Sequence, residues 1–497
     1  MASSGEEIRN YRVKKLELLK KAGTNPYPAK LPFAVSELVF IKKNFKKLAS
    51  SKKLLGVAGR ILAKREHGGS AFLDIFDGTG NLPAGKAGLQ IFLREDKVGK
   101  NAYKLFLETA DIGDFVAVSG KAFYTKRKEP TIEAARWEML AKSLLPMPEK
   151  WHGLQDIEER FRKRYLDLLM NSSVKERFLF RSRLIYKLRS LLDKEGFVEV
   201  ETPVLQTMAG GASAQPFKTR HNALDIDLWL RIATEIHLKY LLIGGFNKVY
   251  EIGRIFRNEG IDATHNPEFT TLELYIAYSD HENLMKFAEK LLGDLAVLAA
   301  KNKIITFGGQ KISFKAPFKK ITFIEALERH ALITDYPKKS RGDLVTFAMR
   351  FGVNPESHES KDKIAEKIFA KVCRPKFIQP TFVVDYPAST LPLAKRSPKN
   401  PEAVLSFQVV AGGIEIVKAF NELNDPIDQR ERLKKEAAVG AEGDAEAQPL
   451  DEEFIEALEY GMPPAAGLGI GLDRLVMLFT DTDNIKEVIL FPTMKPK

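Results

Sequence analysis

The segment YEIGRIFRNEGIDATHNPEFTTLELYIAY, residues 250–278, reads as two strands joined by a polar loop. Alternate residues of a strand share a face, so the second strand turns Phe269, Glu273 and Tyr275 to one side and its aliphatic residues to the other. A hairpin that places Arg257 near Phe269 offers a guanidinium beside a flat ring, which suits a nucleotide because the base can stack and the phosphate can be paired. For this hairpin alone, a solvated polar face is the simpler interpretation.

A second candidate segment is GGIEIVKAFNELNDP, residues 412–426. Its period-two pattern places Lys418, Phe420 and Glu422 on one face of a strand. This face combines an aromatic ring with two opposite charges.

A third segment, GLGIGLDRL, residues 467–475, contains glycines that allow close approach of the backbone. Arg474 follows them near a helix start, where anions are favoured. The chain has no phosphate loop of the G-x-x-x-x-G-K-[ST] type, no H-E-x-x-H and no Ser/His/Asp set, and its 8 scattered histidines argue against a zinc site.

The composition excludes several classes of protein. The chain has 497 residues, enough for two or three domains, and no apolar run long enough to span a bilayer. Its N-terminus lacks the apolar core of a secretory signal. The single cysteine, Cys373, cannot form a disulfide framework within one chain and fits a reducing compartment. We therefore expect a cytoplasmic protein without a membrane partner.

The charge balance leaves two interpretations open. Lys and Arg number 77 against 65 Asp and Glu, an excess of 12 positive charges. Such an excess suits a polyanion partner, such as nucleic acid or a phosphate-rich substrate, and it equally suits a solubility surface.

Changes in residue pattern predict the domain organisation. Residues 1–53 read as a basic helical extension, and residues 54–145 as short β-rich runs between glycine turns, a pattern typical of a small barrel or sandwich. Residues 146–153 contain two prolines and read as a linker. Residues 154–497 mix helices with long antiparallel stretches, which predicts an α+β fold rather than a doubly wound parallel sheet.

Three segments in this order resemble the signature motifs of class II aminoacyl-tRNA synthetases. The segment GFVEVETPVL (196–205) resembles motif 1. The segment near 250–275 resembles motif 2, and GLGIGLDRLVMLF (467–479) resembles motif 3. The β-rich segment resembles the OB-fold anticodon-binding domain of the lysine, aspartate and asparagine subgroup. GGASAQPF, RIATEIHLKYLLIGGF, FNELNDPIDQRERL and NIKEVILFPTMKP are similar to the lysyl-tRNA synthetases within that subgroup.

The resemblance implies a fold and a reaction. The expected fold is α+β, with a six- or seven-stranded antiparallel sheet flanked by helices behind an N-terminal five-stranded OB-fold barrel, in a homodimer. The expected reaction joins L-lysine to tRNA(Lys) through a lysyl-adenylate, with ATP as substrate and Mg²⁺ as metal ion, and releases pyrophosphate and AMP. Positioning and charge neutralisation carry such a reaction without a protein nucleophile.

The same resemblance assigns site residues by motif position. Arg257 and Arg474 are the expected catalytic residues. The expected ATP-binding residues are Arg257, Glu259, His265, Asn266, Phe269, Glu415 and Arg474. The expected lysine-binding residues are Gly211, Glu235, Arg257, Glu273, Tyr275, Phe420 and Glu422. The expected anticodon-binding residues are Phe72, Gln90 and Glu138, and Glu415 is the expected magnesium ligand.

Two positions depart from the commonest pattern of the resembled family. Gln408 stands where a magnesium-binding glutamate is usual, and Lys418 where an asparagine usually contacts the substrate. We hypothesise that Lys418 supplies part of the phosphate neutralisation that a metal ion would otherwise give. The alternative is neutral drift, with Lys418 pointing to solvent.

Other functions remain open at this point. One is a synthetase for a different amino acid, since Lys418 is expected in the pocket. Another is a non-catalytic paralogue that binds tRNA or a partner, although retention of the expected site residues speaks against it. A related ligase that lysylates a translation factor lacks the anticodon domain, so residues 54–145 argue against that function.

Overall fold

The computed structural model describes residues 2–80, 88–148, 154, 156–441, 443–444 and 446–496, with side chains from residue 5 onward. Residues 149–153 of the predicted linker therefore lie outside the described residues. The chain divides into two compact units, Met1–Arg160 with Tyr165–Ser172, and Phe161–Arg164 with Ser173–Lys497. They are called unit 1 and unit 2 below. Among the described residues, no helix combines the length and the apolar character needed to cross a membrane.

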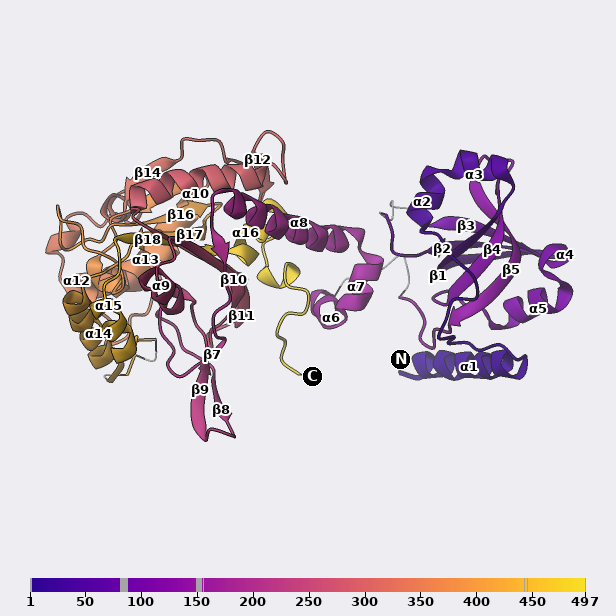
Figure 1. Cartoon of the computed structure of the whole chain (residues 1–497), viewed down its shortest axis with the longest axis horizontal. Coiled ribbons are helices and arrows are strands. Elements are labelled where there is room, and N and C mark those ends of the chain that lie inside the picture. The colour runs from indigo at the N-terminus through magenta and orange to yellow at the C-terminus, as the bar shows by residue number, and fades with distance from the viewer. Residues whose placement is uncertain are drawn as a thin grey trace. The chain divides into compact units, whose positions relative to one another are not determined.

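Unit 1 is built on a closed barrel of five strands (Figure 1). The strands are β1 (Leu54–His67), β2 (Ser70–Phe76), β3 (Leu89–Arg94), β4 (Phe115–Tyr124) and β5 (Pro130–Ala141), in the order β1-β2-β3-β5-β4. Along β2 and β3, buried residues alternate with partly exposed ones, because one face of each strand fills the barrel. The predicted five-stranded barrel is confirmed.

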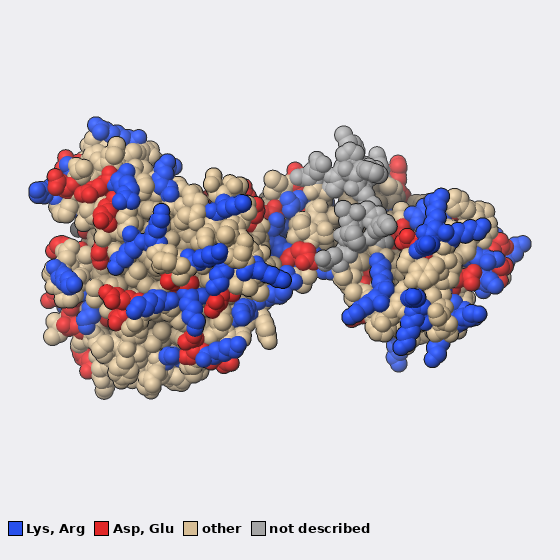
Figure 2. All heavy atoms as spheres, turned by 90° about the horizontal axis from the view of Figure 1, so that it is seen from above, with Lys and Arg blue, Asp and Glu red and all other residues tan. Residues whose placement is uncertain are grey.

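Short helices surround this barrel. They are α1 (Ala2–Lys21), α2 (Leu38–Lys43), α3 (Phe45–Ser51), α4 (Glu95–Val98) and α5 (Lys100–Thr109); α6 (Ile157–Arg162) and α7 (Arg164–Met170) follow along the chain. On the face shown in Figure 2, Lys and Arg are spread over the surface among Asp and Glu rather than gathered in one patch. The charge excess by itself therefore marks no single nucleic-acid surface on that face.

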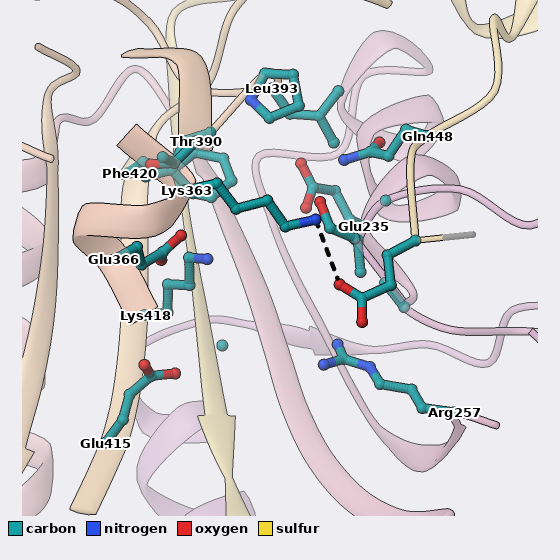
Figure 3. Close-up of a pocket in the computed structure, with 18 of the residues that line it drawn as sticks. Glu235, Arg257, Lys363, Glu366, Thr390, Leu393, Glu415, Lys418, Phe420 and Gln448 are labelled. Carbon is teal, nitrogen blue, oxygen red and sulfur yellow. Dashed lines mark ion pairs between the residues drawn. The ribbon is translucent and has the colours of Figure 1, made fainter. Parts of the chain in front are cut away.

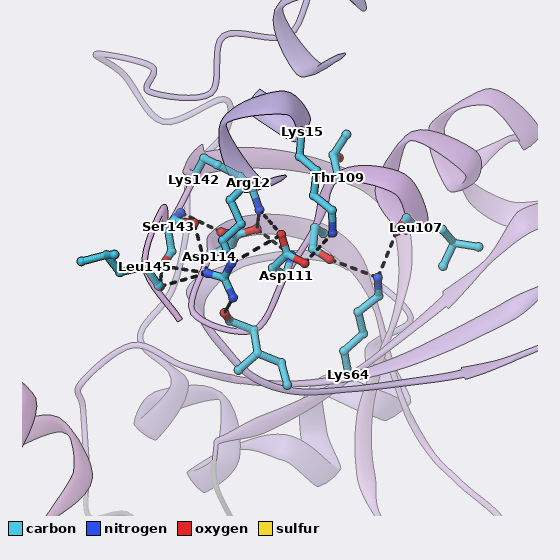
Figure 4. A network of polar contacts seen from close by, with 12 residues as sticks. Arg12, Lys15, Lys64, Leu107, Thr109, Asp111, Asp114, Lys142, Ser143 and Leu145 are labelled. Carbon is cyan, nitrogen blue, oxygen red and sulfur yellow. Dashed lines mark hydrogen bonds and ion pairs between the residues drawn. The ribbon is translucent and has the colours of Figure 1, made fainter. Parts of the chain in front are cut away.

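A buried ionic network fastens α1 to the barrel (Figure 4). Lys142 Nζ lies 2.6 Å from an oxygen of Asp111 and 2.7 Å from one of Asp114, and the side chains of Lys142 and Asp114 are both fully buried. From α1, Lys15 Nζ reaches the other oxygen of Asp111 at 2.6 Å, and Arg12 donates to the carbonyl oxygen of Ser143 at 3.1 Å. The basic N-terminal helix is thus part of the barrel's own polar framework.

Unit 2 contains an eight-stranded sheet in the order β14-β15-β16-β17-β18-β11-β10-β6. Its strands are β6 (Val198–Glu199), β10 (Lys248–Phe256), β11 (Glu268–Ala277), β14 (Lys319–Thr322), β15 (Thr381–Val384), β16 (Ser406–Ala411), β17 (Ile414–Asn421) and β18 (Ala465–Gly471). The pairs β14–β15 and β10–β6 are parallel and the others antiparallel. The α+β class is confirmed; the sheet is larger than expected because short parallel strands extend both edges.

Smaller sheets and helices complete unit 2 (Figure 1). The small strands are β7 (Leu205–Gln206), β8 (Lys218–His221), β9 (Ile226–Leu230), β12 (Ile304–Phe307) and β13 (Gln310–Ser313). The helices are α8 (Ser172–Lys194), α9 (Glu235–Ile243), α10 (His281–Ala296), α11 (Phe323–Ala326), α12 (Arg341–Arg350), α13 (Lys361–Ile368), α14 (Pro426–Ala441), α15 (Glu452–Glu459) and α16 (Leu472–Phe479).

The two faces of the sheet have different environments. On one face, α8, α10 and α16 pack against the aliphatic side chains of the central strands, including Leu272 and Leu274 of β11. On the other face, Tyr275 packs in a separate cluster with residues of α9 and α15. This face also carries the glycines of β18, which leave room above the strands. The alternation predicted for residues 269–276 is therefore observed, and it separates the core from a hollow face.

Replacing Lys142 by Met should destabilise unit 1 by about 3–5 kcal/mol, because it leaves the fully buried carboxylate of Asp114 without its cation, while Asp111 keeps Lys15. Hydrogen exchange of the barrel amides in the full chain measures this loss. Lys104→Met is the matched control, since its side chain is 74% exposed and its pair with Glu108 spans 3.8 Å. Equal exchange in the two variants would contradict a structural role for the network.

Candidate active site

A cavity of about 830 Å³ opens on the hollow face of the unit 2 sheet. Strands β11, β17 and β18 form its floor, and residues of α13 and α14 lie on its other side. The expected site residues that line it are Gly211, Glu235, Arg257, Glu259, His265, Asn266, Phe269, Glu273, Tyr275, Glu415, Phe420 and Arg474. Segments more than two hundred residues apart in sequence therefore meet in one cavity.

The opening hairpin supplies the guanidinium and ring expected from its sequence. Arg257 Cζ lies 5.3 Å from the centre of the Phe269 ring. The hairpin closes through backbone pairing, since Arg257 N donates to the carbonyl oxygen of Pro267 at 2.9 Å. The Arg257 side chain also donates to the carbonyl oxygen of Ile232, with Nη2 at 3.3 Å. The interpretation of this face as merely solvated is not supported, because both side chains line the cavity.

Arg474 joins the hairpin loop to the start of α16. Its Nη2 lies 2.9 Å from Nε2 of His265, whose Nδ1 lies 2.9 Å from the carboxylate of Asp262. Asn266 Nδ2 donates to the carbonyl oxygen of Glu268 at 2.7 Å, while its buried Oδ1 has no partner among the described residues. This end of the cavity thus presents two guanidinium groups and an amide oxygen without a partner.

The opposite end of the cavity is acidic, and a lysine that the sequence reasoning missed pairs with its carboxylates from behind the lining residues. Lys239 of α9 is completely buried, and its Nζ lies 2.6 Å from Oε1 of Glu235 and 2.6 Å from Oε2 of Glu422. Glu235 and Lys239 are four residues apart, so they share one side of the helix. That spacing in EIHLK was the only sequence signal for this pair.

Burial perturbs the ionisation of these groups. Burial, together with the charge of Glu235, raises the pKa of Glu273 to about 7, although the hydrogen bonds from Thr234 oppose the shift. Burial likewise raises the pKa of Glu422, although the ammonium of Lys239 opposes the shift. Burial alone would lower the pKa of Lys239, but the charges of Glu235 and Glu422 outweigh it and raise that pKa. Unless a further cation enters, the raised pKa values of Glu273 and Glu422 favour the protonated forms of these two side chains.

A glycine permits this arrangement. A Cβ at Gly467 would lie 2.2 Å from Oε1 of Glu422 and 2.4 Å from Cε1 of Tyr275. Glu422 does not itself line the cavity, but Gly467 and Tyr275 do. Its Oε1 is buried and has no hydrogen-bond partner among the described residues. One oxygen of Glu422 is therefore paired with Lys239, and the other lies behind the cavity floor without a partner.

Three ionic side chains lie together on one wall of the cavity (Figure 3). Lys418 of β17 lies between Glu366 of α13 and Glu415 of β17 in this view. Strict alternation along β17 would put Glu415 on the face opposite Lys418, so the role expected of Glu415 requires a bulge. A register shift between Val409 and Val410 of the paired strand supplies it, and both side chains line the cavity. Glu366 had no sequence signal, because it belongs to a helix whose position depends on tertiary packing.

The donor atoms near Glu415 do not fit a magnesium ion held by the protein. Glu415 Oε2 lies 3.2 Å from Nη2 of Arg374, and the buried Gln408 accepts a hydrogen bond from the Tyr386 hydroxyl at 2.8 Å. Magnesium needs several oxygen ligands in near-octahedral geometry, whereas here a carboxylate is already paired and the neighbouring amide is engaged elsewhere. In the described part of the chain, no three His, Cys, Asp or Glu side chains are grouped so that they could hold a metal ion.

The expected anticodon residues belong to unit 1. Phe72 and Gln90 lie on the paired strands β2 and β3, whereas Glu138 lies apart from them on β5. The rings of Phe72 and Phe92 stack with centres 4.4 Å apart, and Gln90 of the same strand as Phe92 accepts from Thr131 Oγ1 at 2.9 Å. Glu138 lies on β5 beyond the segment that pairs with β3, and it accepts from Arg136 at 2.9 Å. Phe92 was missed from the sequence; its place opposite Phe72 depends on strand register.

Comparison with known proteins agrees with this architecture. The family model described as "tRNA synthetases class II (D, K and N)" matches residues 156–495, and that described as "OB-fold nucleic acid binding domain" matches residues 56–140. The chain is 47% identical over 492 residues to a lysine–tRNA ligase of Moorella thermoacetica, covering 99% of this chain and 98% of the relative. It is 46% identical over 491 residues to that of Carboxydothermus hydrogenoformans, with the same coverage, and 41% identical over 500 residues to one from Dehalococcoides mccartyi.

The matches cover both units and include the three motif segments that meet in the cavity. Enzymes of this family use ATP as a substrate. The chain is therefore a ligase that belongs to the class II aminoacyl-tRNA synthetases of the aspartate, lysine and asparagine group, in the family of the lysine–tRNA ligases.

Proposed function

We propose that this enzyme attaches L-lysine to tRNA(Lys) in two steps through a lysyl-adenylate, with release of pyrophosphate and AMP. The observation that carries the proposal is the charge of the acidic end of the cavity. Glu235, Glu273 and Glu422 contribute three carboxylates there, against the single ammonium of Lys239. When these groups are ionised, two negative charges remain, which matches the two ammonium groups of lysine.

The side chains around this end suggest how lysine is oriented. Glu235 and Gly211 hold the α-ammonium, and Glu273 and Tyr275 hold the side-chain ammonium. Glu422 attracts the same ammonium by its charge from behind Gly467 of the cavity floor. The ring of Phe420 packs against the methylene groups. Aspartate would place its carboxylate among three others, so this pocket selects against it.

The nucleotide lies at the other end of the cavity in this proposal. Arg257 pairs with the α-phosphate and the lysine carboxylate, and Phe269 stacks on adenine. Arg474 contacts the other face of the base and the γ-phosphate, and Glu259, His265 and Asn266 complete the nucleotide contacts. Magnesium enters with ATP as part of that substrate, and no protein carboxylate is assigned to it.

Two bond exchanges follow from this placement. A lysine carboxylate oxygen attacks the α-phosphorus, and the bond from that phosphorus to the bridging oxygen breaks, so pyrophosphate leaves with its electron pair. A ribose hydroxyl of the terminal adenosine of tRNA then attacks the lysyl carbonyl carbon, and AMP leaves. Arg257 stabilises the charge that develops on the α-phosphate, and fixed positions make both attacks intramolecular.

The partners follow from the same proposal. Phe72, Gln90 and Glu138 contact the anticodon, with Phe92 extending the aromatic surface on which bases stack. We further propose a homodimer, because the motif 1 segment exposes Val198, Val204 and Leu205. The cytoplasm, where lysine, ATP and tRNA are present together, is the proposed compartment.

ATP–pyrophosphate exchange measured with each of the twenty amino acids tests the function. Lysine should support exchange, and aspartate and asparagine should not, because neither neutralises the acidic end of the cavity. Exchange that is fastest with another amino acid would refute the lysine assignment. No exchange with any of them would favour a non-catalytic tRNA-binding role.

Lysine binding should weaken about tenfold between pH 8 and pH 6, because a carboxyl with a raised pKa near 7 must lose its proton before it can pair with an ammonium. Affinity is retained above that pKa and lost as pH falls through it. Calorimetry in two buffers of different ionisation enthalpy should detect proton release on lysine binding near pH 7. Glu273→Gln should bind lysine weakly at pH 8 and depend on pH less than wild type does, with the remaining dependence coming from Glu422, whose pKa burial also raises. A wild-type affinity that is flat from pH 6 to 8 would contradict this role.

Gly467→Ala should weaken lysine binding by about tenfold or more, since the added Cβ forces Glu422 and Tyr275 to move. ATP binding should change far less, because those two residues are absent from the nucleotide end. Gly210→Ala is the matched control: its nearest neighbour would be Cγ1 of Ile236 at 3.7 Å, an ordinary contact. Similar lysine affinities for the two variants, measured by calorimetry, would refute the close-packing argument.

A further inference from the structure

Lys418 is a cation in the cavity without a direct partner. Its side chain lines the cavity, and no hydrogen bond or ion pair joins its Nζ to any described residue. Its charge acts on Glu366 and Glu415, between which it lies in Figure 3. In the sheet, Lys418 is paired with Gln408 of β16 on one side and with Gly469 of β18 on the other. Neither neighbour carries a carboxylate. The neutral-drift alternative, with Lys418 in solvent, does not describe this position.

Arg374 forms an ion pair with the carboxylate of Glu415. Its Nη2 lies 3.2 Å from Oε2 of Glu415, and its Cζ lies 5.9 Å from the centre of the Phe369 ring. The chain just beyond Arg374 is bound to the turn between β16 and β17, where Gly413 N donates to the carbonyl oxygen of Phe377 at 3.0 Å. Arg374 does not line the cavity, so it acts through Glu415 as a positioning residue.

The charges at this end of the cavity favour a polyanion. Arg257, Arg374, Lys418 and Arg474 all act on Glu415. Against these four cations stand three carboxylates, those of Glu415, Glu366 and Asp262, the last of which acts on Arg474. Ionised, the group carries one excess positive charge beside the ring of Phe269. A metal cation at Glu415 would meet repulsion from Lys418 and compete with Arg374, whereas a phosphate chain would relieve the excess.

We propose that Lys418 binds the polyphosphate of ATP as a fixed cation, and that Arg374 keeps Glu415 paired, so that ATP binding does not depend on a magnesium ion held by the protein. The inference rests on the proposed function, because it takes ATP as the occupant of this end of the cavity. It assigns the charge neutralisation of the phosphates to lysine and arginine side chains that are present before the nucleotide arrives.

Calorimetric titration of the full chain with ATP, in excess magnesium chloride and in excess EDTA, tests the proposal without any reaction. Removing magnesium should change the wild-type Kd by less than about tenfold. Lys418→Met should raise the Kd in EDTA by about tenfold or more, because the methionine keeps the length of the side chain and loses the charge. Lys376→Met is the matched control, since Lys376 is exposed, does not line the cavity and should leave both values unchanged.

Glu415→Gln separates the two roles of this carboxylate. If Glu415 held the metal, the variant would lose the gain in affinity that magnesium gives. Under the proposal, the variant binds ATP at least as tightly as wild type in EDTA, since one negative charge has been removed from the phosphate end. Thermal unfolding is measured for every variant, and Lys418→Asn replaces Lys418→Met if the methionine variant does not fold.

Two outcomes would overturn the inference. One is a wild-type Kd that rises by more than about a hundredfold in EDTA together with a lost magnesium effect in Glu415→Gln. The other is a Kd of Lys418→Met in EDTA equal to that of wild type. Lysine-dependent pyrophosphate exchange in the same preparation keeps this test separate: exchange without magnesium-independent ATP binding refutes only the inference, and absence of exchange refutes the proposed function.

Discussion

The buried ion pairs of Lys239 with Glu235 and Glu422 are the constraint on which the cavity depends. Three carboxylates next to one another in an apolar surrounding would take up protons or push their strands apart. One ammonium from α9 holds two of them at 2.6 Å while leaving one oxygen of Glu422 without a partner. The acidic end of the cavity can therefore exist before any ligand enters, and α9 is fixed against the sheet by the same contacts.

The strands of the sheet place opposite charges at the two ends of the cavity. One end carries carboxylates around Lys239, and the other carries cations around Glu415. A ligand pair with ammonium groups at one end and phosphates at the other is aligned by this field before it makes specific contacts. The register of β11, β17 and β18 sets the distance between the ends, and the glycines of β18 leave the space between them open. The strand pairing that defines the fold thus also sets which ligands the cavity selects.

Much of the fold and many of the residues that line the cavity could be predicted because strand alternation and the motif segments are local signals. Phe269, Glu273 and Tyr275 follow directly from period-two reading, and their cavity positions agree with it. Lys239, Arg374 and Glu366 could not be found this way, since each acquires its partner only when separate elements pack. For Glu415, alternation alone gives the face opposite Lys418, so its expected role required a bulge, and the register shift beside Val410 adds the residue that alternation does not count.

The loop that joins β10 and β11 carries a chain of contacts through a single imidazole. His265 accepts from Arg474 at Nε2 and faces the Asp262 carboxylate with Nδ1, so these hydrogen bonds are satisfied by a neutral ring with its proton on Nδ1. The orientation of Arg474 at the start of α16 is thereby tied to the imidazole of a residue in the loop between β10 and β11. The second and third motifs are thus joined through one side chain, so a change in the loop reaches the helix without passing through the sheet.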